Sequence, residues 1–202
     1  MDADHSNITD DLSKLLKRLN EISARDFAIL ADAQLQWKPR PECWSIVECL
    51  QHLVLQLELY LPKIDQAVLK GKTFNITADG TAFRSGFLGK YLLSSIRIKD
   101  DNSIQRFSKC PNKLRPESTI EGAASLVVEN YFQYSAQLLN LLSVSKALHL
   151  EQIKVTLPLV PLFRLKLGDM LQYLVYHIER HIVQAQKVHC EVGFPRVGNL
   201  MI

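Results

Sequence analysis

The sequence predicts an all-α fold, a four-helix bundle with a long crossover connection between its second and third helices. Four long segments carry apolar residues at helical spacing, and no segment shows sustained alternation of apolar and polar residues. Glycine and proline number only eight each, which is few for a turn-rich β protein. The 202 residues, 47% of them hydrophobic, suit one globular domain spanning residues 1–202.

The first predicted helix runs from about Ile8 to Leu35. Its N-terminus is indicated by Thr9, Asp10 and Asp11, whose side-chain oxygens can cap free backbone N–H groups. Its apolar stripe recurs at intervals close to three and four residues and consists of Leu12, Leu15, Leu16, Leu19, Ile22, Phe27 and Leu30.

The second predicted helix follows a loop, LQWKPRPECWS, in which two prolines prevent a continuous helix. Ser45 and Glu48 have the spacing of a capping box, so we expect this helix to run from Ile46 to about Lys70. Pro62 lies inside that span and predicts a kink or a local break.

Residues 72–118 form the predicted crossover, because glycines and prolines recur along them. Within this segment, GFLGKYLLSSIRI is expected to form a short helix or to end in a strand-like run. The stretch KCPNKLRPEST is expected to be a loop. The third helix should then start at Ser118 or Thr119 and end near Lys146.

The fourth predicted helix is preceded by KVTLPLVPLFRLKLG, whose two prolines indicate an extended approach. The helix itself should start near Gly168–Asp169 and end before Gly193.

Charge and cysteine usage exclude several classes of protein. The net charge is only +3 and no Lys/Arg cluster stands out, which argues against nucleic acid as a partner. The four cysteines form no CxxC pair, and a chain with a full-sized core needs no disulfide framework. The acidic N-terminus lacks a signal peptide, and no apolar run is long enough to span a membrane. The sequence therefore predicts a cytoplasmic protein without a nucleic-acid or membrane partner.

Three histidines are candidate metal ligands. His177 and His181 lie one turn apart in HIERHIVQ, within or at the edge of the apolar face of the fourth helix. Such a pair is weak evidence by itself. His52 faces the apolar side of the second helix, however, and a third inward-facing imidazole is what a three-histidine site requires. Three protein ligands leave a coordination position open for water or substrate. His149 and His189 are expected at the surface.

For several neighbours of these histidines the sequence allows two roles, one at the site and one in packing or at the surface. Gln184, one turn beyond the pair, either orients a histidine or a bound water, or is a polar residue at the helix edge. Cys49, one turn before the histidine of the second helix, is either a ligand or a small buried hydrophobe. Tyr173 either lines a cavity or packs in the core. Trp37 and Trp44 are expected to pack over the end of the bundle.

Two motifs carry a family resemblance. The stretch Trp44–Leu53, WSIVECLQHL, resembles the WS-x-x-E-x-x-x-H-L signature of the DinB superfamily. His177, His181 and Gln184 resemble the H-x3-H-x-x-Q ending of the same family. The order of the helices is similar over nearly the whole chain. One departure is that many relatives carry Arg-Gly where this chain has residues 182–183, Ile-Val.

The resemblance implies a divalent metal ion, nickel or zinc, bound by His52, His177 and His181 with water completing its coordination. Characterised relatives include S-transferases that use low-molecular-weight thiols, and an isomerase. The implied activity is therefore that of a metal-dependent enzyme, activating a thiol for S-transfer or water for hydrolysis on a small electrophile. The alternative is a non-catalytic, stress-related binding or interaction bundle with a structural metal or none. An exposed apolar helix face would allow a homodimer.

Overall fold

The computed structural model of the protein describes residues 8–98, 110–116 and 124–196. These residues are mostly helical, which confirms the prediction of an all-α protein. The structure comprises six α-helices, one 3-10 helix and one small sheet. In chain order they are α1 (Ile8–Asp26), α2 (Asp32–Leu35), α3 (Ile46–Thr73), α4 (Phe87–Ile96), η1 (Asn112–Leu114), α5 (Ala124–Ser145), β1 (Lys154–Thr156), β2 (Arg164–Lys166) and α6 (Leu167–His189).

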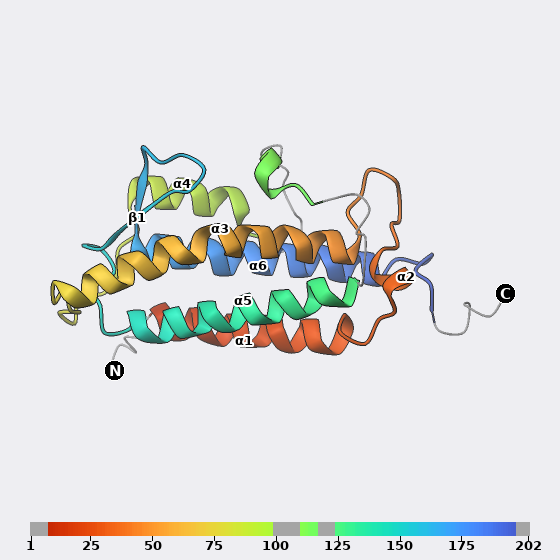
Figure 1. Ribbon diagram of the computed structural model, residues 1–202, viewed down its shortest axis with the longest axis horizontal. Coiled ribbons are helices and arrows are strands. Elements are labelled where there is room, and N and C mark those ends of the chain that lie inside the picture. Colours follow the sequence, from red (N-terminus) through yellow and green to blue (C-terminus); the bar gives the residue numbers. More distant parts are fainter. Residues whose placement is uncertain (1–7, 99–109, 117–123, 197–202) are drawn as a thin grey trace, which may run out of the picture.

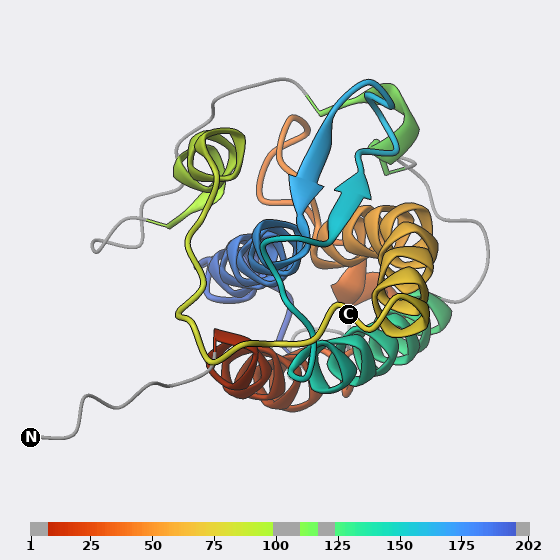
Figure 2. The same ribbon diagram turned by 90° about the vertical axis from the view of Figure 1, so that its left-hand side faces the viewer.

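Four long helices, α1, α3, α5 and α6, lie side by side along the long axis of the molecule (Figure 1). α3 packs against α5 and α6, and α1 packs against the same two helices. The view along the axis shows α4 and the β-hairpin lying outside the four helices (Figure 2). The apolar stripes of the four helices meet in one core, as amphipathic helices require.

The first helix is shorter than predicted. α1 ends at Asp26, and residues 27–31 form a turn before the separate α2, so the predicted continuation to Leu35 was wrong. Tertiary contacts provide the reason. Asp32, at the start of α2, turns its carboxylate towards α5 and accepts hydrogen bonds from the backbone N–H groups of Ala124 and Ser125 at 3.1 and 3.3 Å. Those N–H groups have no partner within their own helix, so the carboxylate caps α5.

The start of α3 agrees with the predicted capping box. The Ser45 hydroxyl accepts from the N–H of Glu48 at 3.2 Å, and the Glu48 carboxylate accepts from the N–H of Ser45 at 2.7 Å. Lys38 in the preceding loop donates to the same carboxylate at 2.7 Å and ties the loop to the helix. Further along, the helix continues through Pro62 without the predicted break.

The segment between α3 and α5 contains α4 and η1. GFLGKYLLSSIRI forms a helix and no strand, and part of KCPNKLRPEST is the short turn η1. α4 is fixed to α6 by Asp169, which is buried and accepts hydrogen bonds from the Ser85 hydroxyl and from the N–H of Gly86, 3.0 Å away. The predicted start of the third helix at residues 118–119 lies outside the described residues.

The extended approach to α6 is a two-stranded antiparallel hairpin, and this pairing was not predicted from the sequence. Val155 pairs with Leu165, and both side chains are buried against the core. The alternate positions point outward, so Lys154 faces Lys166 and Thr156 faces Arg164 across the strands. Within the described part of the chain, none of the helices has the length and hydropathy that crossing a bilayer requires.

Candidate metal centre

The three predicted ligands come together in the core. His52 lies in the second turn of α3, and His177 and His181 lie on consecutive turns of α6. Their exposed fractions are only 3%, 8% and 6%. The i, i+4 spacing on α6 puts two imidazoles on one face, and the packing of α3 against α6 brings the third to them.

The imidazoles converge through their ε nitrogens. Nε2 of His177 lies 3.4 Å from Nε2 of His52 and 2.9 Å from Nε2 of His181. The three residues offer ligand atoms that all lie within 4.8 Å of one another. Nitrogens bound at about 2.0–2.1 Å to one tetrahedral ion lie about 3.3 Å apart. The donor type and the spacing therefore fit a single divalent ion.

A backbone carbonyl fixes the tautomer of His52. Its Nδ1 lies 2.7 Å from the carbonyl oxygen of Leu114 in η1. A carbonyl oxygen only accepts, so in the neutral ring Nδ1 donates and Nε2 keeps its lone pair for the centre of the cluster. Metal-binding histidines are commonly held in this way.

The other two imidazoles have a different environment. Among the described residues, Nδ1 of His177 and Nδ1 of His181 are buried without a hydrogen-bond partner. Two adjacent buried rings with unsatisfied nitrogens are costly, because burying a polar group without a partner loses its hydration. These δ nitrogens lie on the other side of each ring from Nε2, so the indication of a metal ion comes from the donor type and the spacing of the ε nitrogens.

Burial also controls the charge of the site. It lowers the pKa of His52, although the hydrogen bond to Leu114 opposes the shift. Burial lowers the pKa values of His177 and His181 well below the ordinary value, and the neighbouring imidazoles and the Arg180 guanidinium lower them further. All three rings are therefore neutral near pH 7, which is the state that binds a metal ion.

Aromatic side chains flank the imidazoles. The Trp44 indole stacks on His181 with 5.6 Å between ring centroids and 26° between ring planes, and it lies 5.1 Å from the histidine ring of α3. The Tyr173 ring lies 5.5 Å from that of His177. The Tyr173 hydroxyl accepts a hydrogen bond of 3.4 Å from the side-chain amide of Gln56.

The predicted neighbours of the histidines occupy different places. Tyr173 lies beside the imidazoles, as described above. Gln184 is half-buried one turn beyond His181, and its side chain opposes the lowering of that residue's pKa. Cys49 is completely buried in the hydrophobic core, and burial raises the pKa of its thiol. Within the described residues the cluster of potential ligands consists of the three histidines, so Cys49 supplies no fourth ligand.

Sequence reasoning missed two contributors to the site. Trp44 was expected to pack over the bundle end, yet it lies directly against two imidazoles. Leu114 contributes only its carbonyl oxygen, which no side-chain pattern reveals. Near it, the half-buried Cys110 has its sulfur 3.6 Å from Nδ1 of His52. A signal for Trp44 was its place directly before the Ser45 cap, two residues before the first residue of the helix that carries His52.

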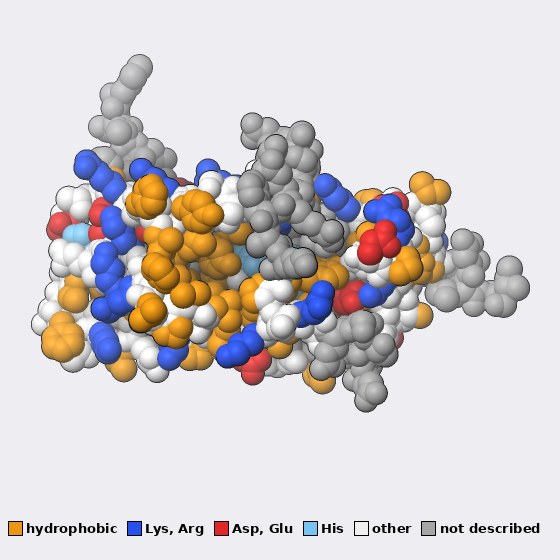
Figure 3. Space-filling model, turned by 90° about the horizontal axis from the view of Figure 1, so that it is seen from above, with side chains coloured by type: hydrophobic (Ala, Val, Ile, Leu, Met, Phe, Trp, Pro, Cys, Tyr) orange, Lys and Arg blue, Asp and Glu red, His pale blue; other side chains and the backbone are white. Residues whose placement is uncertain are grey.

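The remaining histidines lie elsewhere. His149 pairs with Asp79 at 3.4 Å, and His189 packs edge-on against Phe27 and Phe194. His5 lies outside the described residues. On the face of the molecule seen in Figure 3, histidine atoms reach the surface near the middle, next to hydrophobic side chains. The three clustered histidines themselves are buried.

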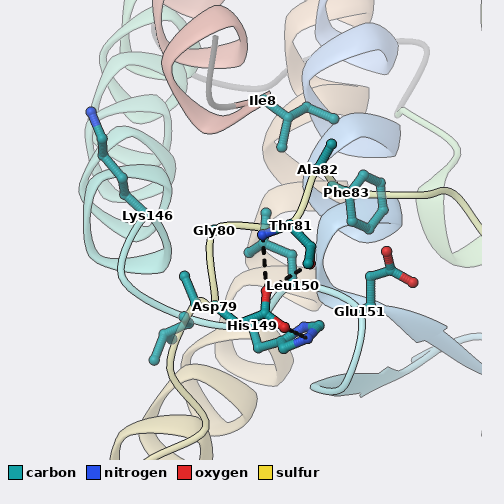
Figure 4. Close-up of a pocket in the computed structure, with 12 residues that line it drawn as sticks. Ile8, Asp79, Gly80, Thr81, Ala82, Phe83, Lys146, His149, Leu150 and Glu151 are labelled. Carbon is teal, nitrogen blue, oxygen red and sulfur yellow. Dashed lines mark hydrogen bonds and ion pairs between the residues drawn. The ribbon is translucent and has the colours of Figure 1, made fainter. Parts of the chain in front are cut away.

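A separate cavity of about 370 Å³ lies near the start of α1 and the end of α5 (Figure 4). Asp79 lines this cavity and accepts hydrogen bonds from the N–H and the hydroxyl of Thr81 at 3.0 and 2.6 Å. Its lining includes none of the three clustered histidines. Of its acidic groups, Asp79 pairs with His149 and Glu151 pairs with Lys166. Among the described residues, the cavity lining holds no cluster of three potential metal ligands.

The fold and the site together define a class, that of helical proteins with a buried three-histidine cluster shared between two long helices. The model of the DinB superfamily matches residues 9–185, a range that includes both motifs and all three histidines. The chain therefore belongs to the DinB superfamily, and the resemblance stated from the motifs is confirmed. Searches of curated proteins and of solved structures give no match.

Proposed function

We propose that His52, His177 and His181 bind one divalent metal ion, nickel or zinc, and that the protein is a metal-dependent enzyme. The single observation that carries this proposal is the convergence of three buried, neutral imidazoles on one point. We further infer that the four long helices form a four-helix bundle, with the crossover between α3 and α5 supplying η1. In this arrangement the core of the bundle holds the metal and the crossover orients one of its ligands.

A divalent ion held by the neutral imidazoles of His52, His177 and His181 would supply an uncompensated positive charge, which would lower the pKa of a bound thiol or water molecule. The chain's own groups then set the conditions. Leu114 keeps the ligand nitrogen of His52 deprotonated and in place. Trp44 and Tyr173 present ring surfaces that orient a small substrate and limit competing water.

The proposed reaction is S-transfer from a low-molecular-weight thiol to a small electrophile, or hydrolysis of that electrophile. The two reactions differ in what would bind the metal beside the three histidines, which is a thiol for S-transfer and a water molecule for hydrolysis. For either reaction the site needs three protein ligands, since a fourth would close it. The alternative, a non-catalytic bundle with a structural ion, would require such a fourth ligand.

The first experiment measures the metal content of the purified protein by elemental analysis. Wild type is expected to bind one equivalent of nickel or zinc. His177→Ala should bind far less, because the removal of one of three ligands leaves an incomplete site. His149→Ala is the matched control and should bind as wild type does, since that residue lies outside the cluster. Equal metal contents in wild type and His177→Ala would overturn the proposal.

A second experiment separates the two reactions. The metal-loaded enzyme is incubated with a panel of small electrophiles, once with each of several thiols and once without thiol. A thiol adduct of the electrophile identifies S-transfer, and thiol-independent product identifies hydrolysis. If loaded wild type and His177→Ala convert every electrophile at the same rate, the enzymatic part of the proposal fails.

A further inference from the structure

The hairpin turn exposes a group of large apolar side chains. Val160, Leu162 and Phe163 lie in the turn between β1 and β2, with exposed fractions of 45%, 93% and 51%. On α4, which also lies outside the four long helices, Phe87 and Tyr91 are exposed as well. Figure 3 shows hydrophobic side chains gathered on this face. Apolar groups clustered in this way on a monomer usually indicate a binding surface.

The base of the same hairpin is strongly basic. A groove of about 170 Å³ between α3 and the hairpin is lined by Lys63 and Lys70 from the helix and by Lys154 and Arg164 from the strands. The other lining residues are Gln66, Ala67 and Thr156, so the groove has four cations and no acid. Within the described parts of the chain none of these four cations forms an ion pair. Figure 3 shows Lys and Arg side chains bordering the hydrophobic ones.

The strand register concentrates this charge. Lys154 lies directly opposite Lys166 across the hairpin, and like charges in that position repel. Lys166 is neutralised by Glu151 at 2.6 Å, whereas the ammonium group of Lys154 donates only to the backbone carbonyl of Glu151 at 2.8 Å. The outward face of the hairpin therefore keeps uncompensated positive charge next to its exposed apolar turn.

We propose that this surface docks the protein peripherally on an anionic lipid bilayer. We call it the hairpin face and define it by Val160, Leu162, Phe163, Lys63, Lys70, Lys154 and Arg164. The apolar turn enters the boundary between headgroups and acyl chains, and the cations at its base meet lipid phosphates. Peripheral docking needs no membrane-spanning helix. The search of the sequence for a long apolar run therefore could not detect this kind of membrane partner.

Charge favours an anionic partner over a second copy of the chain. A two-fold dimer contact uses the same patch on both subunits, so the hairpin face would meet its own cations. Anionic lipid offers the complementary charge instead. The inference does not depend on the metal site, because the groove and the turn contain none of the three histidines.

The test is co-sedimentation of the full chain with vesicles of phosphatidylcholine alone or with added phosphatidylserine. Wild type is expected to sediment with the anionic vesicles and to be released by high salt. Lys154→Gln combined with Arg164→Gln should weaken binding about thirty-fold, because each cation near an anionic surface contributes a factor of about five. Leu162→Ser combined with Phe163→Ser should weaken binding to the same vesicles by removing the inserted turn.

Matched controls come from α1 and from the turn at residues 27–31 that follows it; α1 lies on the opposite side of the molecule from the hairpin (Figure 1). Lys14→Gln combined with Lys17→Gln removes the same charge from exposed positions, and Ile29→Ser removes an exposed apolar side chain. Both controls should bind vesicles as wild type does. Unchanged circular dichroism spectra establish that each variant is folded.

Three results would overturn the proposal. The first is a lack of specific binding. It would be seen if wild type failed to sediment with anionic vesicles, or if the control variants lost binding as much as the hairpin variants do. The second is release by millimolar inorganic phosphate together with unchanged binding of the Leu162→Ser, Phe163→Ser variant, which would identify a site for soluble anions. The third is a wild-type dimer in the absence of lipid that the same variant converts to monomer, which would assign the face to a second copy.

Discussion

Acidification of the metal-free protein should destabilise it through the buried imidazoles. Burial lowers the pKa values of His177 and His181 well below 6.5, and the neighbouring His52 and Arg180 lower them further. In the unfolded chain both side chains titrate near 6.5. Below that pH the unfolded chain binds protons that the folded protein excludes, so the free energy of unfolding falls as the pH falls. Above about pH 7.5 both states are neutral and the effect vanishes.

The magnitude follows from proton linkage. One histidine that protonates only in the unfolded chain lowers the free energy of unfolding by up to about 1.4 kcal/mol per pH unit. His177 and His181 together therefore remove up to about 2 kcal/mol between pH 6.5 and 5.5, because each is only half protonated in the unfolded chain at pH 6.5. His52, whose pKa is also lowered by burial, adds to this loss. The free energy of unfolding of a domain is usually roughly 5–15 kcal/mol, so this loss is a large part of it.

Urea unfolding in the presence of a chelator, at pH 7.5, 6.5 and 5.5, measures the effect. The combined variant His177→Gln, His181→Gln removes both titrating groups and should lose much less stability on acidification. Its carboxylates are those of wild type, so the difference between the two proteins isolates the imidazoles. His149→Gln serves as the control and should follow wild type. A wild-type free energy that stays constant from pH 6.5 to 5.5, or an equal loss in the combined variant, would refute the reasoning.

Three further predictions concern the scaffold, and urea unfolding at pH 7.5 checks each of them. Ser45→Ala removes the cap of α3 and should cost about 1 kcal/mol, and an unchanged midpoint would contradict the role of the capping box. Pro62→Ala should raise stability by up to about 3 kcal/mol, since proline is unfavourable inside a helix and this position is exposed. A loss of stability would show that the proline is needed there. Gly89→Ala should cost about 1–3 kcal/mol, because its Cβ would lie 2.2 Å from Cγ of the buried Asp169, and wild-type stability would refute this.

The sequence by itself determined the long helices and the candidate ligand set. Apolar spacing revealed the four long helices, because helix periodicity is encoded within a few turns of chain. The capping box at Ser45 was equally local, since its two hydrogen bonds join residues three apart. Inward-facing positions then selected His52, His177 and His181. Wheel position alone could not decide whether Cys49 joined them, because a neighbour on the same helix can face the core without reaching the cluster.

Only the tertiary structure decided the surroundings of the histidines and the shape of the connections. The carbonyl that orients His52 belongs to Leu114, 62 residues away in the chain, and carries no side-chain signal. The end of α1 depends on a distant contact, because the carboxylate of Asp32 accepts a hydrogen bond from Ala124 at the start of α5, 92 residues further on. The hairpin before α6 placed its cations and apolar turn on one face through strand pairing. Local patterns specify which residues face inward, but contacts between distant segments arise only when the helices pack, and those contacts determine what surrounds the three clustered histidines.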